Sequence, residues 1–249
     1  MAVNSSNVDS LLAKRNTCRI GKAGNHSDAI NRLEISKLLA NNYEGFNVLR
    51  KHLIHPKDQP KISNPSKNVK SSIELLSDLG WITHVQNGRW EFSKGTASSE
   101  YAFIKGNWLE EYVYCAHIHA GVDEVSYGQE VEWKVGDVIG KNEIDVIARR
   151  GDKLSFTSCK TQHPFPANGS TNQITGFLTE VDYWDTHFAN NNGKLLLVVT
   201  ADFIDEMENN RHRYPLVVAR ASVLNVDMIG LEDLRWDRLV EKIGMHWDE

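Results

Sequence analysis

The chain has 249 residues, of which 41% are hydrophobic and 24% are charged. This is the composition of a globular protein with one large domain or two modest ones. No apolar run approaches the ~20 residues that a membrane span needs, and the polar start MAVNSSNVDS lacks an apolar signal core. Three scattered cysteines are too few for a disulfide framework or a zinc ribbon. We therefore expect a cytoplasmic protein without a membrane partner.

The net charge of −5 is unevenly distributed along the chain. Residues 1–100 carry 14 Lys and Arg against 9 Asp and Glu, whereas residues 101–249 carry 14 against 24. Such an asymmetry is typical of two units with different tasks, for example a module that faces nucleic acid beside a unit that concentrates carboxylates. Chance scatter of charges is the alternative.

The first hundred residues predict a loose segment followed by a small domain. Residues 1–27 are polar and show no periodicity, so we expect a loose N-terminal segment there. Three helices and a hairpin are then expected, at 28–39, 46–53, 71–79 and 81–92. Helices followed by a hairpin are the order of a winged helix, which predicts a winged-helix-like domain over residues 28–100. Such a domain binds nucleic acid or another protein, and both interpretations stay open.

The segment between Arg50 and Lys70 is the most cationic part of the chain, with six basic residues and one acidic residue. Three prolines within it exclude the interior of a helix. Lysines on such a loop are candidates for contacts with nucleic-acid phosphates. The candidates are Lys57, Lys61, Lys67 and Lys70.

Residues 101–249 predict an α/β (α+β) domain in which helices flank a mixed sheet. Helices are expected at 108–119, 173–187, 203–209 and 231–243. Strands are expected at 125–135, 143–148, 153–160, 194–200 and 216–224.

Two of these strands carry a candidate metal site in the stretch NEIDVIARRGDKLSFTSCKTQ, residues 142–162. The first strand offers Glu143 and Asp145 on one face, and the second ends at Lys160. A carboxylate holds Mg²⁺ together with waters that can supply a nucleophile, while a lysine stabilises charge on an attacked phosphate. The pattern predicts a metal-dependent phosphodiesterase, with an ordinary surface ion pair as the alternative.

Two further groups can complete this site. Glu110, in the predicted helix GNWLEEYVY, can bring a second carboxylate to the same metal ion. The peptide carbonyl of Cys159 is a further oxygen ligand of the kind that Mg²⁺ prefers. The candidate groups thus come from three separate elements, as an assembled site requires.

The runs GNWLEEYVY and NEIDVIARRGDKLSFTSCKT resemble the PD-(D/E)XK nuclease domain of CRISPR-associated ancillary nucleases. In that family a restriction-endonuclease-like domain is joined, through a winged-helix-like segment, to a Rossmann-like sensor of cyclic oligoadenylate. The resemblance implies Mg²⁺- or Mn²⁺-dependent cleavage of DNA, RNA or both by a homodimer, in prokaryotic antiviral defence. It also implies catalytic roles for Glu110, Asp145, Ser158 and Lys160, with Glu110, Asp145 and Cys159 at the metal.

Two departures from the family pattern leave alternatives open. The family has Glu-x-Lys on the second strand, where this chain has Ser158, Cys159 and Lys160. Ser158 is a poorer metal ligand than a carboxylate, so the rivals are a nucleic-acid-binding protein with a degenerate site and a winged-helix scaffold for protein contacts. Restoring the pattern with Ser158→Glu is expected to raise activity. The preceding residues do not predict a Rossmann unit, so we expect no cyclic-oligoadenylate sensor domain.

Overall fold

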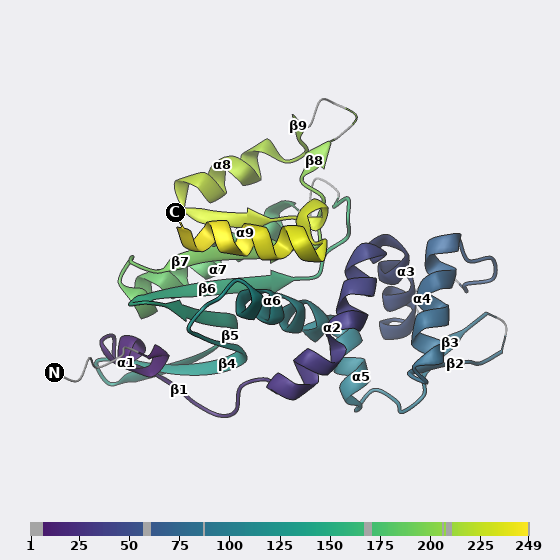
Figure 1. Ribbon diagram of the computed structural model, residues 1–249, viewed down its shortest axis with the longest axis horizontal. Helices are drawn as coiled ribbons and strands as arrows, with labels where there is room; N and C mark the ends of the chain where they lie inside the picture. The colour runs from purple at the N-terminus through teal and green to yellow at the C-terminus, as the bar shows by residue number, and fades with distance from the viewer. Residues whose placement is uncertain are drawn as a thin grey trace. The chain divides into compact units, whose positions relative to one another are not determined.

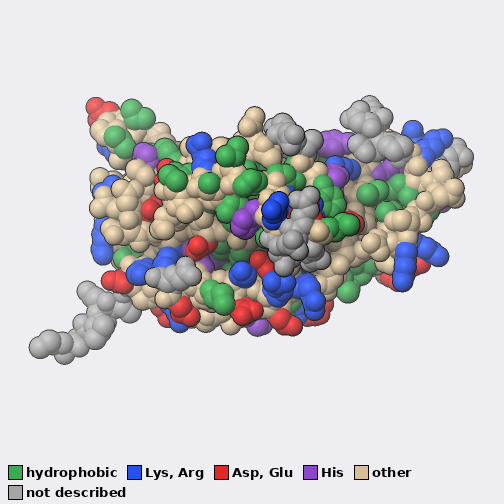
Figure 2. Space-filling view, turned by 90° about the horizontal axis from the view of Figure 1, so that it is seen from above, with side chains coloured by type: hydrophobic (Ala, Val, Ile, Leu, Met, Phe, Trp, Pro, Cys, Tyr) green, Lys and Arg blue, Asp and Glu red, His purple; other side chains and the backbone are tan. Residues whose placement is uncertain are grey.

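The structure is a computed structural model that describes residues 7–56, 61–86, 88–166, 171–205, 207 and 211–248 (Figure 1). The chain divides into two compact units, one formed by Met1–Leu33 with Glu110–Glu249 and the other by Glu34–Leu109. In the part described, no helix is long and apolar enough to cross a membrane. Figure 2 shows a face on which basic, acidic and apolar side chains are intermixed.

The smaller unit, Glu34–Leu109, contains the helices and the hairpin that the sequence predicts. Its core includes Trp108, whose ring stacks on Tyr43 and meets Phe46 edge to face, with ring centroids 5.8 and 5.7 Å away. Its elements are the end of α2 (His26–Asn41), α3 (Tyr43–Ile54), α4 (Lys67–Asp78), β2 (Ile82–His84), β3 (Trp90–Phe92), α5 (Ser99–Ala102) and the π-helix η1 (Phe103–Asn107).

The larger unit is built on a six-stranded sheet in the order β1-β4-β5-β6-β7-β10. The pairs from β1 to β6 are antiparallel, and those from β6 through β7 to β10 are parallel. Parallel neighbours need a crossover connection, which α7 (Thr171–Trp184) supplies between β6 and β7. The strands are β1 (Thr17–Arg19), β4 (Glu124–Val135), β5 (Val138–Arg150), β6 (Lys153–Lys160), β7 (Lys194–Val199) and β10 (Val226–Ile229). The predicted mixed sheet is confirmed.

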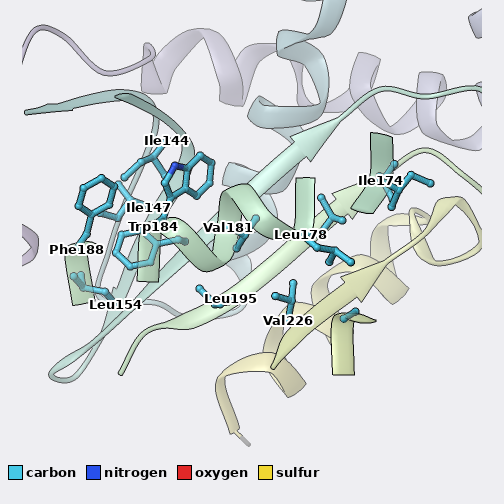
Figure 3. Packing of buried hydrophobic residues seen from close by; sticks show 14 of the residues in the cluster. Ile144, Ile147, Leu154, Ile174, Leu178, Val181, Trp184, Phe188, Leu195 and Val226 are labelled. Carbon is cyan, nitrogen blue, oxygen red and sulfur yellow. The ribbon is translucent and has the colours of Figure 1, made fainter. Parts of the chain in front are cut away.

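One face of this sheet carries the main hydrophobic core. Helix α7 buries Ile174, Leu178 and Val181 at helical spacing, and Figure 3 shows them along the helix in one cluster with the sheet residues Ile147 and Leu195. The core is completed by residues of α1 (Val8–Ala13) and α8 (Pro215–Val223). Burial of this apolar surface fixes α7 on the sheet.

The other face is covered by α6 (Trp108–His119) and α9 (Trp236–Asp248) through polar as well as apolar contacts. His117 of α6 lies 3.3 Å from Oγ1 of Thr157, and His246 of α9 lies 2.9 Å from Oγ of Ser155. The remaining elements are the π-helix η3 (Asp185–Ala189), the strands β8 (Ile204–Asp205) and β9 (Arg211–His212), and the 3₁₀ helix η5 (Leu231–Asp233).

The prediction of a loose segment over residues 1–27 is wrong for the described residues 7–27. Strand β1 pairs with β4, and α1 buries Val8, Leu11 and Leu12 in the main core. An element of three residues and one of six are too short for hydrophobic periodicity to reveal.

Two predictions near the C-terminus are also wrong. Where a strand is expected over residues 216–224, the chain forms α8 (Pro215–Val223), although the β-branched residues there favour a strand. Pro215 occupies the first turn of this helix, where its missing N–H costs nothing. The helix expected over 203–209 is replaced at Ile204–Asp205 by β8; residues 206 and 208–210 lie outside the described residues, and β10 was not predicted.

Candidate nuclease site

The candidate site lies where the regular pairing of β5 with both neighbouring strands is interrupted. In the described ladders, the pairing of β4 with β5 has a single gap, at Gly128 opposite Asp145. On the other side, the pairing of β5 with β6 stops at Val146 and Thr157, before Asp145 reaches Ser158. Gly128 has a positive φ of 54°, which is unusual within a strand. The regular pairing of β5 with both β4 and β6 is therefore interrupted at Asp145.

The carboxylate of Asp145 is buried and is held through one of its oxygens. Oδ2 accepts hydrogen bonds from the backbone N–H of Cys159 at 2.7 Å, from Nζ of Lys160 at 3.1 Å and from Oγ of Ser158 at 3.3 Å. Within the described residues, Oδ1 accepts no hydrogen bond. The donors from β6 thus fix the orientation of the carboxylate and leave its second oxygen for a cation or water.

Lys160 lies between two carboxylates. Its Nζ is 3.1 Å from Oδ2 of Asp145 and 3.2 Å from Oε2 of Glu180 on α7. The same nitrogen lies 5.6 Å from the centre of the Phe177 ring. Burial works against the charge of Lys160, but the two carboxylates outweigh it and raise the pKa of the ammonium group. Lys160 is therefore a fixed cation beside Asp145.

Two more carboxyl groups lie in this region. The side chain of Glu110 lies over Gly128, since a methyl group added there would be 3.9 Å from Oε2 of Glu110. Burial, followed by the charges of Asp145 and Glu143, raises the pKa of Glu110 to about 8. Partial desolvation and the nearby Asp145 also raise the pKa of Glu143. Carboxylates that repel one another in this way attract a cation.

The donor chemistry of the site fits Mg²⁺ or Mn²⁺. Among the described residues, no three His, Cys, Asp or Glu side chains form a complete metal site by themselves. The available protein ligands are oxygens of Asp145 and Glu110, and such carboxylates suit hard divalent ions that keep several waters. Asp145 and Glu110 would hold such an ion.

The structure brings Glu110, Asp145, Ser158 and Lys160 into one region, together with the backbone of Cys159; their catalytic roles stay predictions. Burial raises the pKa of the Cys159 thiol well above its usual value, so the thiol is an apolar neighbour and not a nucleophile. Ser158 is 0% exposed and cannot face an incoming ligand. Glu143, which the sequence places on the same strand face as Asp145, is exposed.

Glu180 is the site residue that the sequence analysis missed. It lies three residues after Phe177, and a spacing of three places both side chains on one flank of α7. That spacing is visible in the sequence. The approach of this flank to Lys160 depends on how α7 packs on the sheet, which the sequence pattern does not give.

The predicted phosphate-binding lysines belong to the smaller unit. Lys61, Lys67 and Lys70 are exposed, whereas Lys57 lies outside the described residues. Lys67 and Lys70 are three residues apart on α4, so they share a face of the helix. Among the described residues, Lys70 makes only a long ion pair of 3.9 Å with the exposed Glu74. These side chains are accessible to a polyanion.

One protein-family model matches part of this chain. Residues 98–174, which contain Glu110, Asp145 and Lys160, match the family model of the Card1-like endonuclease domain. No curated protein matches the chain.

Two solved structures share the fold. Protein VC1899 from Vibrio cholerae has a TM-score of 0.69 and 17% identity, over 96% of this chain and 61% of that one. Can2 from Sulfobacillus thermosulfidooxidans, solved in complex with cyclic tetra-adenylate (cA4), has a TM-score of 0.62 and 18% identity, over 95% of this chain and 60% of that one. The chain thus spans about three fifths of the length of both. The family match, together with the shared fold, confirms the predicted resemblance to the nuclease domain of CRISPR-associated nucleases.

Proposed function

We propose that the chain is a metal-dependent endonuclease that hydrolyses phosphodiester bonds of DNA, RNA or both, in a prokaryotic defence system of the CRISPR type. The observation that carries this proposal is the buried Asp145 beside the cation Lys160, 3.1 Å apart, where the regular pairing of β5 with its neighbours is interrupted. The Card1-like endonuclease match over residues 98–174 supports it. The family resemblance adds a homodimer, and the composition of the sequence adds a cytoplasmic location, as parts of the same proposal.

The residues of the site have distinct tasks in this reaction. Asp145 and Glu110 would hold Mg²⁺ or Mn²⁺, which when bound supplies an activated water and neutralises phosphate charge. The peptide carbonyl of Cys159 is a third candidate ligand. Lys160 stabilises the negative charge that develops on the attacked phosphate. The donors from Cys159 and Ser158 hold Asp145 so that one oxygen is presented.

Substrate binding in this proposal uses the smaller unit. Lys61, Lys67 and Lys70 contact phosphates without regard to sequence, because point charges on flexible stems follow the backbone of a nucleic acid. The larger unit has an excess of carboxylates and repels a polyanion except where a metal ion is bound.

A second candidate function is nucleic-acid binding without cleavage. It is favoured by Ser158, which stands where the family has an acidic residue and which is fully buried. A metal site with one carboxylate fewer binds its ion more weakly. In that case phosphate contacts would persist while hydrolysis would be absent.

Asp145→Asn tests the proposed function, because it removes the charge that holds the ion and keeps the side-chain shape. Wild type should cleave DNA or RNA with Mg²⁺ or Mn²⁺ and not with EDTA, and Asp145→Asn should abolish cleavage. Asp152→Asn, in the exposed turn between β5 and β6, is the matched control and should cleave normally.

Thermal unfolding of both variants shows whether the fold is kept. Cleavage by Asp145→Asn at the wild-type rate would refute the site assignment. The alternative outcome is that wild type binds nucleic acid with a steep salt dependence but cleaves neither DNA nor RNA with any divalent metal. That outcome would establish the binding function instead.

A further inference from the structure

Lys160 has a carboxylate partner that comes from neither β5 nor β6. Glu180 lies on α7, twenty residues after Lys160 in the sequence, and its Oε2 is 3.2 Å from Nζ. This distance is equivalent to the 3.1 Å between Nζ and Asp145. The ammonium group is therefore shared between the strand residue Asp145 and the helix residue Glu180.

The flank of α7 that faces Lys160 is fixed by the core. Ile174, Leu178 and Val181 are 0% exposed and hold the helix on the sheet. Glu180 and Phe177 lie beside this buried stripe, and the Phe177 ring centre is 5.6 Å from Nζ of Lys160. An aromatic face and a carboxylate, one turn apart, both stabilise an ammonium group. Because the helix is locked by packing, these contacts hold Lys160 in one place.

Glu180 also supplies a charge that the strand lacks. In the family pattern an acidic side chain stands two residues before the lysine, where this chain has Ser158. The hydroxyl of Ser158 is buried and donates to Asp145 at 3.3 Å, so it gives Lys160 no negative partner. Glu180 brings a carboxylate to the same ammonium group from a different element.

This partner matters most when a metal ion is bound. A divalent ion at Asp145 repels the nearby ammonium group and competes for the charge of that carboxylate. Asp145 alone would then hold Lys160 less firmly. Glu180 attracts Lys160 from α7 and does not depend on the charge state of Asp145.

We propose that Glu180 is a positioning residue, which holds Lys160 at the attacked phosphate while Asp145 binds the metal ion. The proposal rests on the proposed nuclease function, because only there does Lys160 act on a phosphate. It assigns Glu180 no contact with the substrate and no place among the metal ligands.

Steady-state cleavage by four variants tests this role. Glu180→Gln should lower kcat by about 10–100-fold, as loss of a group that orients a catalytic residue does. KM should stay within about threefold. Glu180→Asp, which keeps the charge on a shorter side chain, should recover part of the lost rate. Lys160→Ala should lower kcat by about 100–1000-fold, and the double variant with Glu180→Gln should be no slower than Lys160→Ala alone.

Metal binding gives a readout that does not depend on turnover. Mn²⁺ affinity, measured by titration calorimetry without substrate, should be equal in wild type and Glu180→Gln. Asp182→Asn removes another carboxylate from α7, has no contact with Lys160 among the described residues, and should cleave like wild type.

Three results would overturn the proposal while leaving the nuclease function intact. The first is a wild-type kcat in Glu180→Gln. The second is a loss of kcat in the double variant equal to the product of the losses in the two single variants. The third is weaker Mn²⁺ binding by Glu180→Gln with kcat restored at saturating metal, which would make Glu180 a metal ligand. Absence of cleavage by wild type on every substrate would instead refute the nuclease function and this role together.

Discussion

Gly128 on β4 lies opposite Asp145 on β5, at the single gap in the described pairing of these strands. The consequence is visible on β5, where Ile144 and Ile147 both belong to the main core although residues three apart on a regular strand face opposite sides. The alternation of β5 is thus broken next to Asp145. This break lets the carboxylate meet the donors of β6.

Gly128→Ala adds a single methyl group, yet it should lower both the stability of the fold and the rate of cleavage. The residue has a φ of 54°, a conformation that costs a residue with a Cβ about 1–2 kcal/mol. We expect a loss of that size in the free energy of unfolding, measured with urea, and a larger fractional loss of cleavage. Gly244→Ala, within α9 and with nothing within 4 Å of an added Cβ, is the control and should be neutral or stabilising. Unchanged stability and cleavage would show that the gap tolerates a side chain.

Ser158→Glu should not raise activity, although the family pattern alone predicts a gain. The position is 0% exposed and contacts Asp145. A buried carboxylate beside another costs about 3–5 kcal/mol, so the urea midpoint should fall and cleavage should not improve at any Mg²⁺ concentration. Ser158→Ala, which removes one long hydrogen bond, should cost about 1 kcal/mol or less. Faster cleavage by Ser158→Glu, with half-activation at lower Mg²⁺, would contradict this expectation.

The N-terminal helix should contribute measurably to the stability of the larger unit. Leu12 is 0% exposed and lies in the main core, so Leu12→Ala should lower the free energy of unfolding by about 2–5 kcal/mol. Leu216→Ala, at a position that is 85% exposed, should change it by less than about 0.5 kcal/mol. Equal unfolding curves for the two variants would mean that α1 does not pack as the structure shows.

The exposed lysines of the smaller unit should set the salt dependence of nucleic-acid binding. Replacing Lys61, Lys67 and Lys70 together with Gln should reduce the slope of log K against log salt by up to about 3, since each lysine that binds a phosphate adds about one to that slope. Binding is measured in EDTA by fluorescence anisotropy at several salt concentrations. A matched triple replacement of Lys22, Lys141 and Lys153, which are exposed on the larger unit, should change the slope little. The reverse result would assign phosphate binding to the larger unit.

His117 should make the fold sensitive to acid. Burial, and then the proximity of His246, lower the pKa of His117 to about 3. Trp247 donates to Nδ1, so the neutral ring carries its proton on Nε2, next to Thr157. A folded-state pKa below the usual value gives stability that is present above pH ~6.5 and is lost as the pH falls below it, by about 1.4 kcal/mol per pH unit.

His117→Gln should therefore flatten the decline of stability between about pH 6.5 and pH 4.5, measured as the urea midpoint. The matched control is His212→Gln on the exposed β9, which should leave the wild-type pH profile unchanged. A wild-type profile in His117→Gln would show that other groups cause the acid sensitivity.

The sequence by itself determined those parts of the site that depend on residues close together along the chain. The helix at 108–119 and the strand ending at Lys160 follow from hydrophobic periodicity, and a tight turn with Gly151 at a φ of 65° joins β5 to β6. Since a hairpin brings its two strands together whatever the rest of the chain does, Asp145 and Lys160 could be paired from the sequence. The resemblance at these same residues then gave the chemistry.

The tertiary structure alone decided which distant segments join them. Strand β1 completes the sheet against β4, α8 forms where β-branched residues favour a strand, and Glu180 reaches Lys160 from α7. These outcomes depend on how whole faces of side chains pack, and neither a three-residue strand nor a single glutamate on a helix flank leaves a periodic signal. Local patterns fix which elements form and carry the candidate groups, whereas long-range packing fixes which groups meet.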